Sequence, residues 1–156
     1  MQHRMKEHQL DKSQIETMLN CIQTGTIATI NSDSTPYVVP VHFVYLNDKI
    51  YFHGLPKGQK IENIKFNHNV CFNIYEMYGI VLDQDKKICD TNTKYQSVVI
   101  LGTAKIIDDL KVKEEVLNKI IIKYTPDITN YEIPQNMIKG TAIIEINIDQ
   151  ITGKYY

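Results

Sequence analysis

The residues best suited to binding chemistry lie in a short turn, residues 57–60, which includes Gly58, Gln59 and Lys60. A helix that begins near Gly58 presents backbone N–H groups that have no partner within the helix. These groups and the helix dipole attract an anion, and Lys60 adds a full positive charge one turn in. The turn predicts a local anion site, although the fragment alone also fits a solvated loop with ordinary surface lysines.

A histidine, His53, ends the apolar segment just before this turn. Such a side chain could hydrogen-bond a bound ring or a substrate, and an ordinary histidine pKa of about 6.5 suits proton donation. A bond from His53 to a neighbouring carbonyl is the structural alternative. His42 alternates with apolar neighbours on the preceding segment, which favours a structural role for it.

Two further polar residues, Gln96 and Ser97, stand at the start of the apolar run 98–101. They could face a cleft at the rim of a sheet, or simply mark the entry of a strand. His3 and His8 have a spacing that suits neither a helix face nor a strand, so no metal site is predicted. The common sequence motifs of hydrolases, P-loop proteins and zinc proteases do not occur, which suits a protein whose cofactor does the chemistry.

Hydrophobic periodicity predicts the elements that must position these residues. Ser13 and Glu16 have capping-box spacing at the start of the first helix. Pro40 cannot donate to a strand ladder and therefore marks an edge or a bulge. The predicted elements are a helix over 13–23, strands over 26–30, 37–45 and 49–53, a helix over 58–67, strands over 69–82 and 95–107, a helix over 109–124 and a strand over 144–149.

Side-chain patterns give each of these elements a predicted face. The pattern predicts that Ile61 and Ile64 face inward on the short helix. The last helix is expected to place Leu110, Leu117, Ile121 and Tyr124 on one side, and the final strand is expected to be half exposed. Residues 83–94 and 125–139 are predicted to be irregular. The pattern favours a mainly β, α+β fold, an antiparallel barrel with helices packed outside, and an α+β sandwich fits nearly as well.

Composition limits the class of protein. The 156 residues favour one domain, residues 1–156, with residues 1–10 as a flexible arm. Seventeen basic and 18 acidic residues give a net charge of −1, so neither nucleic acid nor an acidic membrane is an expected partner. Three cysteines without a Cys-x-x-Cys pair, and no apolar leader or span, predict a reduced, cytoplasmic protein.

Several segments resemble, in order and spacing, the FMN-binding split-barrel family that includes pyridoxamine 5'-phosphate oxidase. The similarity is strongest to its Nim-type nitroimidazole-resistance subgroup and covers most of the chain. The segments that carry it are Tyr37-Val38-Val39-Pro40-Val41, Tyr51-Phe52-His53-Gly54, Gly58-Gln59-Lys60, Asn67-His68-Asn69-Val70-Cys71-Phe72, Tyr95-Gln96-Ser97-Val98-Val99 and Ile151-Thr152-Gly153-Lys154.

The resemblance implies a six-stranded antiparallel split β-barrel of Greek-key character that forms a homodimer with FMN at the interface. It also implies a role for each matching residue. The backbone of Val39, Pro40 and Val41 would line the isoalloxazine ring. His53 and Gly54 would lie near the ring or ribityl chain; Gly58, Gln59 and Lys60 would meet the phosphate; Gln96 and Ser97 would make polar contacts to the ribityl chain or phosphate.

This sequence also departs from the family pattern. Gln59 stands where a second basic residue is common, and His42 where a smaller polar residue is common. The only arginine is Arg4, so the substrate-binding arginines of a true pyridoxamine 5'-phosphate oxidase are missing and that activity is disfavoured.

The resulting hypothesis is an FMN-dependent oxidoreductase that reduces a small planar acceptor, for example a nitroaromatic, with His53 as the polar contact to the acceptor. The alternative is a non-catalytic flavin- or haem-binding module that acts as a carrier or sensor. A deazaflavin in place of FMN is a third possibility.

Overall fold

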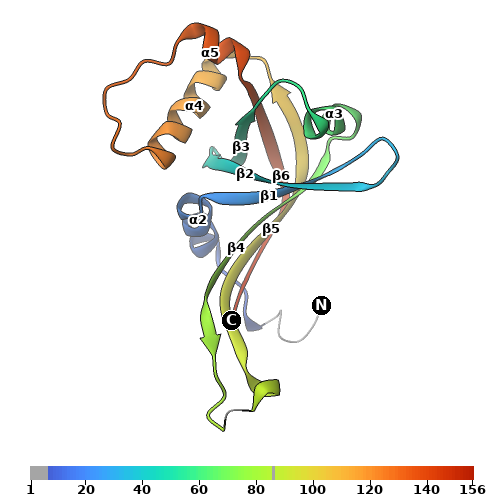
Figure 1. The fold of residues 1–156 in the computed structure, drawn as a ribbon, viewed down its shortest axis with the longest axis vertical. Coiled ribbons are helices and arrows are strands. Elements are labelled where there is room, and N and C mark those ends of the chain that lie inside the picture. Colours follow the sequence, from blue (N-terminus) through green and yellow to red (C-terminus); the bar gives the residue numbers. More distant parts are fainter. Residues whose placement is uncertain (1–6, 86) are drawn as a thin grey trace.

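The computed structural model describes residues 7–85 and 87–156, with the side chain of Asp90 left out (Figure 1). The described elements are α2 (Lys12–Cys21), β1 (Thr24–Ile30), β2 (Pro36–Leu46), β3 (Lys49–Gly54), α3 (Gln59–Phe66), β4 (Asn69–Val81), the 3-10 helix η1 (Ile88–Asp90), β5 (Asn92–Ile107), α4 (Leu110–Tyr124), α5 (Gln135–Gly140) and β6 (Ala142–Tyr155).

The strands form a closed barrel in the order β1-β2-β3-β6-β5-β4, and every neighbouring pair is antiparallel. After β3 the chain passes through α3 and returns as β4 beside β1, so the first four strands have the spatial order 4-1-2-3. That order is a Greek key. The predicted six-stranded antiparallel barrel with flanking helices is therefore confirmed, and the sandwich alternative is wrong.

The barrel interior is filled by aromatic and branched side chains from alternate strand positions, among them Phe43, Phe52, Phe72, Ile100 and Ile144, all with no solvent exposure. A second apolar cluster lies where α4 packs outside β2, β3 and β6, and it contains Val44, Tyr51, Val116, Ile120 and Ile143. These three strands are consequently buried on both faces beneath α4.

Burial beneath α4 corrects the prediction for the last strand. We expected β6 to alternate between a buried and an exposed face, but Ala142, Ile143, Ile144, Glu145 and Ile146 are all buried. The strand also begins before residue 144 and runs to Tyr155. Alternation along one strand cannot reveal a helix that covers its outer face, which is why the prediction failed.

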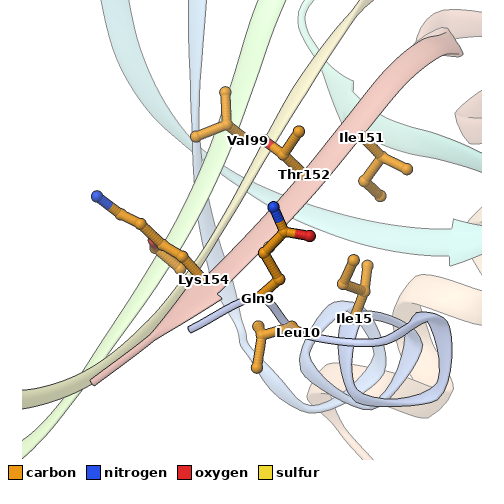
Figure 2. A pocket seen from close by; sticks show the side chains of 9 residues that line it. Gln9, Leu10, Ile15, Val99, Ile151, Thr152 and Lys154 are labelled. Atoms are coloured by element: carbon orange, nitrogen blue, oxygen red, sulfur yellow. The ribbon is translucent and has the colours of Figure 1, made fainter. Parts of the chain in front are cut away.

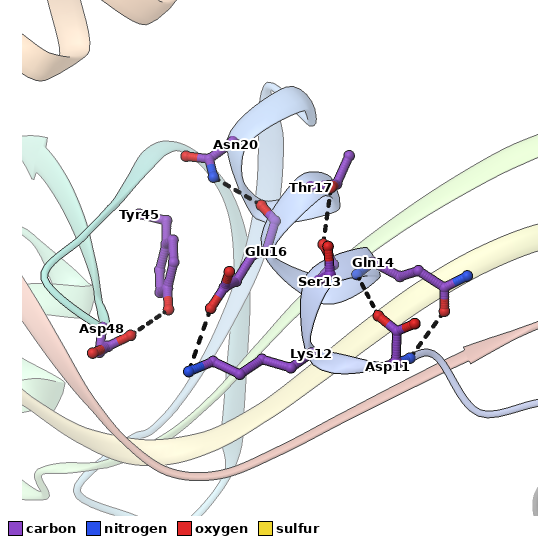
Figure 3. A network of polar contacts seen from close by, with 9 residues as sticks. All are labelled: Asp11, Lys12, Ser13, Gln14, Glu16, Thr17, Asn20, Tyr45 and Asp48. Atoms are coloured by element: carbon purple, nitrogen blue, oxygen red, sulfur yellow. Dashed lines mark hydrogen bonds and ion pairs between the residues drawn. The ribbon is translucent and has the colours of Figure 1, made fainter.

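The capping-box prediction for the first helix is also wrong in its residues. Asp11, not Ser13, is the N-cap: its carboxylate accepts a hydrogen bond from the Gln14 backbone N–H at 2.8 Å, and the Gln14 side chain accepts from the Asp11 N–H at 2.9 Å (Figure 3). Glu16 instead forms an ion pair with Lys12 at 3.6 Å. Aspartate and serine are equally good N-cap residues. The pairs Asp11/Gln14 and Ser13/Glu16 both have capping-box spacing, so spacing alone cannot decide between them.

The predicted face of helix α4 is only partly correct: Leu117 and Tyr124 pack against the second apolar cluster, but they are not the most buried residues of the helix. Its buried residues are Lys113, Val116 and Ile120, whereas Leu110 is 41% exposed. Three consecutive isoleucines, Ile120-Ile121-Ile122, point in different directions around the helix. The sequence therefore does not determine which face packs inward.

Two other segments are more regular than expected. The predicted loop 83–94 contains η1 and the start of β5, and all but the last residue of α5 lies within residues 125–139, which were predicted to be irregular. Strands β4 and β5 extend well beyond the barrel as a long hairpin (Figure 1).

The predicted N-terminal arm falls largely on residues 1–6, which lie outside the described residues. By contrast, residues 8–10 are bonded to β6: the His8 carbonyl accepts from the Tyr155 N–H at 3.0 Å, and the Leu10 N–H donates to the Gly153 carbonyl at 3.0 Å. Leu10 is also buried.

Candidate functional site

Strands β2 and β3 separate at one end, and this opening positions most of the predicted site. The β2–β3 ladder ends at the pair Phe43–Phe52. Beyond it, the first part of β2 pairs only with β1, for example through Pro40 and Thr26. Pro40 therefore lies on a strand edge, as predicted. Continuing the register brings the backbone of residues 39–41 of β2 to the level of the end of β3.

Lys60 places a positive charge at the end of β3. A β-carbon built on Gly54 would lie 3.6 Å from the Lys60 Nζ, and Nζ is 5.6 Å from the centre of the Phe52 ring. Among the residues that the structure describes, no carboxylate forms an ion pair with Lys60. The ammonium is therefore available to an external anion.

Helix α3 adds hydrogen-bond donors beside this ammonium. Gly58 is its N-cap with a φ of 133°, a backbone conformation that favours glycine, and no side chain caps the helix. The Gly58 carbonyl accepts from the N–H groups of Ile61 and Glu62. The N–H groups of Gln59 and Lys60 lie in the first turn and have no acceptor within the helix, so they can bind an anion. Two buried isoleucines, Ile61 and Ile64, fix the helix on the barrel, as predicted.

The side chain of Gln59 has a structural role that the sequence did not reveal. Its nitrogen donates to the side-chain oxygens of Asn31 at 3.1 Å and Asn63 at 2.9 Å. The Asn63 amide in turn donates to Asn31 at 2.7 Å and to the Thr29 hydroxyl at 3.0 Å, and Asn63 is only 2% exposed. This network ties the start of α3 to β1. An asparagine between two inward-facing isoleucines was the signal that could have identified it.

His53 lies beside the same rim; the residue keeps an exposed surface, but neighbouring groups desolvate part of it. Burial, then the nearby His42 and Lys60, lower the pKa of His53 below the ordinary histidine value. The imidazole is accordingly neutral at pH 7. It is therefore better suited to donating an N–H hydrogen bond than to transferring a proton. His42 stacks on the Tyr124 ring with centres 4.8 Å apart, a structural contact of the kind that the sequence favoured.

Gln96 and Ser97 lie elsewhere. Ser97 pairs with Lys154 near one end of β6, whereas Gly54 pairs with Ala142 at the other end. At ~3.3 Å per residue these positions are roughly 40 Å apart along the strand. Gln96 accepts a hydrogen bond from the Tyr78 hydroxyl at 2.9 Å. Within one chain, the predicted site is thus divided into two halves.

The half-site at Ser97 is a cavity of about 250 Å³ (Figure 2). Ser97 is 6% exposed, and its hydroxyl has no hydrogen-bond partner among the described residues. A buried hydroxyl without a partner is uncommon and suits a ligand that completes it. The cavity is lined by Gln9, Leu10, Ile15, Ser97, Val99, Ile151, Thr152, Gly153 and Lys154.

The described part of the chain holds no group of three or more histidine, cysteine or acidic side chains arranged to bind a metal ion. His3 lies outside the described residues, and the His8 ring packs against Tyr155 and Tyr156. None of the described helices is long and apolar enough to cross a membrane.

The closed Greek-key barrel, in which β2 and β3 pair over only part of their length, has the architecture of a split-barrel protein. The chain belongs to the pyridoxamine 5'-phosphate oxidase family, because the model of that family matches residues 11–155. The family predicted from the sequence is therefore confirmed.

Solved structures extend this comparison. A candidate 5-nitroimidazole antibiotic resistance protein from Bacteroides thetaiotaomicron VPI-5482 is 28% identical, with a TM-score of 0.79 over 94% of this chain and 85% of that one. An F420 reductase is 26% identical, with a TM-score of 0.56 over 87% and 94% of the two chains. A flavocytochrome from Azotobacter vinelandii shares the fold at 21% identity, a TM-score of 0.79 and coverage of 94% and 67%. No curated protein matches the chain.

Proposed function

We propose that this protein is an FMN-dependent oxidoreductase that reduces a small planar acceptor, for example a nitroaromatic. The observation that carries the proposal is the Lys60 ammonium, which has no carboxylate partner among the described residues and lies beside Gly54 at the start of α3. A phosphate fits a cation next to unpaired helix N–H groups. The 28% identity to a candidate nitroimidazole resistance protein supports the choice of acceptor.

In this proposal, different residues at the rim bind different parts of the FMN. Lys60 and the N–H groups of Gln59 and Lys60 hold the phosphate, and the exposed edge of β2 at residues 39–41 lies against the ring system. His53 and Gly54 lie between these two regions. The bound flavin supplies the electron-transfer chemistry. Neutral His53 donates a hydrogen bond to the acceptor and orients it.

The separation of the two half-sites supports the homodimer that we propose. Ser97 and Lys60 lie toward opposite ends of one elongated sheet, so a single cofactor can meet both only if they come from different subunits. The outer faces of β4, β5 and β6 carry exposed apolar side chains that a second subunit would cover, among them Tyr75, Met77, Val99, Leu101 and Ile151.

Subunit complementation tests this arrangement. Variants K60A and S97A are each expected to bind FMN poorly, and a mixture that exchanges subunits is expected to regain one intact site per heterodimer. A monomer at the concentrations of the assay, or a mixture with no recovered binding, would refute the shared interfacial site.

The test of the function itself is spectroscopic. The purified protein is reconstituted with FMN and the visible spectrum recorded; after reduction, reoxidation by nitroaromatic and quinone acceptors is followed by stopped flow. Reoxidation faster than that of free FMN supports the oxidoreductase. Binding without acceleration would indicate the carrier or sensor alternative, and mass spectrometry of the co-purified ligand distinguishes FMN from deazaflavin or haem. The free cysteines Cys21, Cys71 and Cys89 fit the cytoplasmic location that we propose.

A further inference from the structure

Lys154, near the end of β6, carries a positive charge on the same face of the sheet as the buried Ser97. The two residues are paired in the β5–β6 ladder, so their side chains are cross-strand neighbours. Both line the cavity of about 250 Å³, and Lys154 is the only charged residue of that lining. No carboxylate in the described part of the chain forms an ion pair with Lys154. This half-site therefore combines an unpaired cation with a buried hydroxyl that lacks a hydrogen-bond partner.

The Lys154 ammonium has one weak contact within the chain. Its Nζ lies 5.6 Å from the centre of the Tyr95 ring, near the outer limit of a cation–π contact, and Tyr95 in turn stacks on Tyr75. Figure 2 shows the nitrogen end of the side chain pointing away from Leu10 and Ile15, which form an apolar part of the cavity wall. The N–H donors of Lys154 are consequently open to an anion that approaches from outside the chain.

The other half-site, at the start of α3, has only one cation for a phosphate. Lys60 supplies it, because the neighbouring Gln59 is neutral and its side-chain nitrogen already donates to Asn31 and Asn63. A phosphate monoester carries nearly two negative charges at pH 7. Lys60 alone would therefore leave about one charge of a bound phosphate without a matching cation.

We propose that Lys154 of one subunit supplies the second cation to the flavin phosphate that Lys60 binds in the other subunit, with the Ser97 hydroxyl donating to the same phosphate. This inference rests on the FMN-binding dimer proposed above and extends it to a residue that has no role there. Lys60 and Lys154 lie toward opposite ends of one sheet, so they can meet one phosphate only across a subunit interface.

The arrangement links phosphate binding to subunit pairing. In a dimer without FMN the ammonium groups of Lys60 and Lys154 repel each other across the interface, and a phosphate between them replaces this repulsion by two attractions. FMN is therefore expected to strengthen the dimer more than riboflavin, which lacks the phosphate.

Fluorescence titration with FMN and with riboflavin separates a phosphate contact from a ring contact. K154M keeps an apolar side chain over Tyr95 but removes the charge, so the Kd for FMN is expected to rise roughly tenfold or more while that for riboflavin stays unchanged. K154R keeps the charge and should retain most of the FMN affinity. The matched control is K94A, because Lys94 is exposed and its side chain faces away from that of Tyr95 on β5. Equal losses for FMN and riboflavin in K154M, or no loss for either, would overturn the proposal.

Heterodimers show which subunit contributes each lysine. The variants are co-expressed with two different affinity tags, and the heterodimers are isolated and titrated with FMN. A dimer of K60A with K154M has one site with both lysines and one with neither, so it is expected to bind one FMN tightly. A dimer of S97A with K154M lacks one group in each site and is expected to bind none tightly. Two weak sites in the first heterodimer would place both lysines in the site of one subunit and overturn the proposal.

The same titrations separate this inference from the proposed function. An unmodified protein that binds no FMN would refute the FMN-dependent function, and the role of Lys154 with it. An unmodified protein that binds FMN with an affinity that K154M leaves unchanged would refute the role of Lys154 alone.

Discussion

The Lys60 ammonium lies against the backbone of Gly54, where a β-carbon would be 3.6 Å from Nζ. This contact joins the last residue of β3 to the first turn of α3, so a strand end, a helix N-terminus and a free cation meet at one point. The β2–β3 ladder ends just before it. The proposed anion site therefore depends on where the β2–β3 ladder ends as well as on Lys60.

Replacing Lys60 by alanine is expected to weaken FMN binding by about 1.5–3 kcal/mol, the usual range for a hydrogen bond to a charged group. That corresponds to a rise in Kd of roughly 10- to 150-fold, measurable by titration of FMN fluorescence. Lys65, on the same helix, is exposed and pairs with Glu62 at 3.0 Å, so K65A is the matched control and should leave the Kd unchanged. Equal affinities in K60A and the unmodified protein would remove Lys60 from the site.

The pKa of His53 should report on the bound phosphate. In the free protein it lies below the ordinary value, because burial, His42 and Lys60 disfavour the imidazolium. A phosphate dianion at Lys60 offsets that charge, so adding FMN is expected to raise the pKa of His53, as followed by NMR titration with H53N for assignment.

The same shift has a consequence for stability. The imidazole of His53 binds a proton more readily in the unfolded chain than in the folded chain. Protonation of His53 is therefore expected to reduce the free energy of unfolding as pH falls below about 6.5. A His53 pKa above 6.5 in the free protein, or no change on adding FMN, would contradict this description of the rim.

Glu145 is a buried carboxylate that accepts hydrogen bonds from Lys49 at 3.0 Å and from the Tyr51 hydroxyl at 2.8 Å, with Lys105 at 3.1 Å. Burial acts to raise the pKa of Glu145, but these bonds outweigh it and the pKa is lowered. Its contribution to stability is therefore present above the unfolded carboxyl pKa of about 4.3 and is lost as pH falls through the lower folded value.

Replacing Glu145 by glutamine is expected to reduce the free energy of unfolding at pH 7 by about 1–3 kcal/mol, since Lys49 and Tyr51 lose a charged acceptor. The difference from the unmodified protein should shrink as pH is lowered from 5 to 3 in urea titrations. E62Q, which alters an exposed ion pair, is the control and should change stability by less than about 1 kcal/mol. An E145Q difference that does not depend on pH would show that the carboxylate charge is not what stabilises this cluster.

Gly102 is required by a close contact between β5 and β6. A β-carbon there would lie 2.1 Å from the Asn147 carbonyl oxygen, at an irregularity in the β5–β6 ladder. G102A is expected to destabilise the protein by about 1–3 kcal/mol through overpacking. At Gly140, at the end of α5, a β-carbon would meet nothing within 4 Å, so G140A should be neutral or slightly stabilising. Chemical denaturation of the two variants compares them, and equal stabilities would disprove the steric argument.

Local sequence signals located most elements well. The bounds of strand β3 and the inward face of α3 matched the prediction, and the Asn47-Asp48 turn has the positive φ values, 51° and 59°, of a tight hairpin. The rim residues from His53 to Lys60 could be predicted because they are consecutive in the chain, so one strand end and one turn bring them together.

Contacts between distant segments were harder to predict. Neither the role of Asn63 in binding Asn31 nor the double-sided burial of β6 under α4 follows from a local pattern. Lys123, on α4, shows the same limit: by sequence it is an ordinary lysine, and only the tertiary structure places its Nζ 3.9 Å from the centre of the Phe43 ring.

By itself, the amino-acid order determined that this chain would form an antiparallel β protein with a turn bearing glycine and lysine after β3, because alternation, turn residues and helix starts are local properties. Tertiary structure alone decided that Ser97 stands far from Lys60 along the sheet and that Lys123 is desolvated. Strand register and helix packing depend on residues far apart in the chain, and burial is the sum of those contacts.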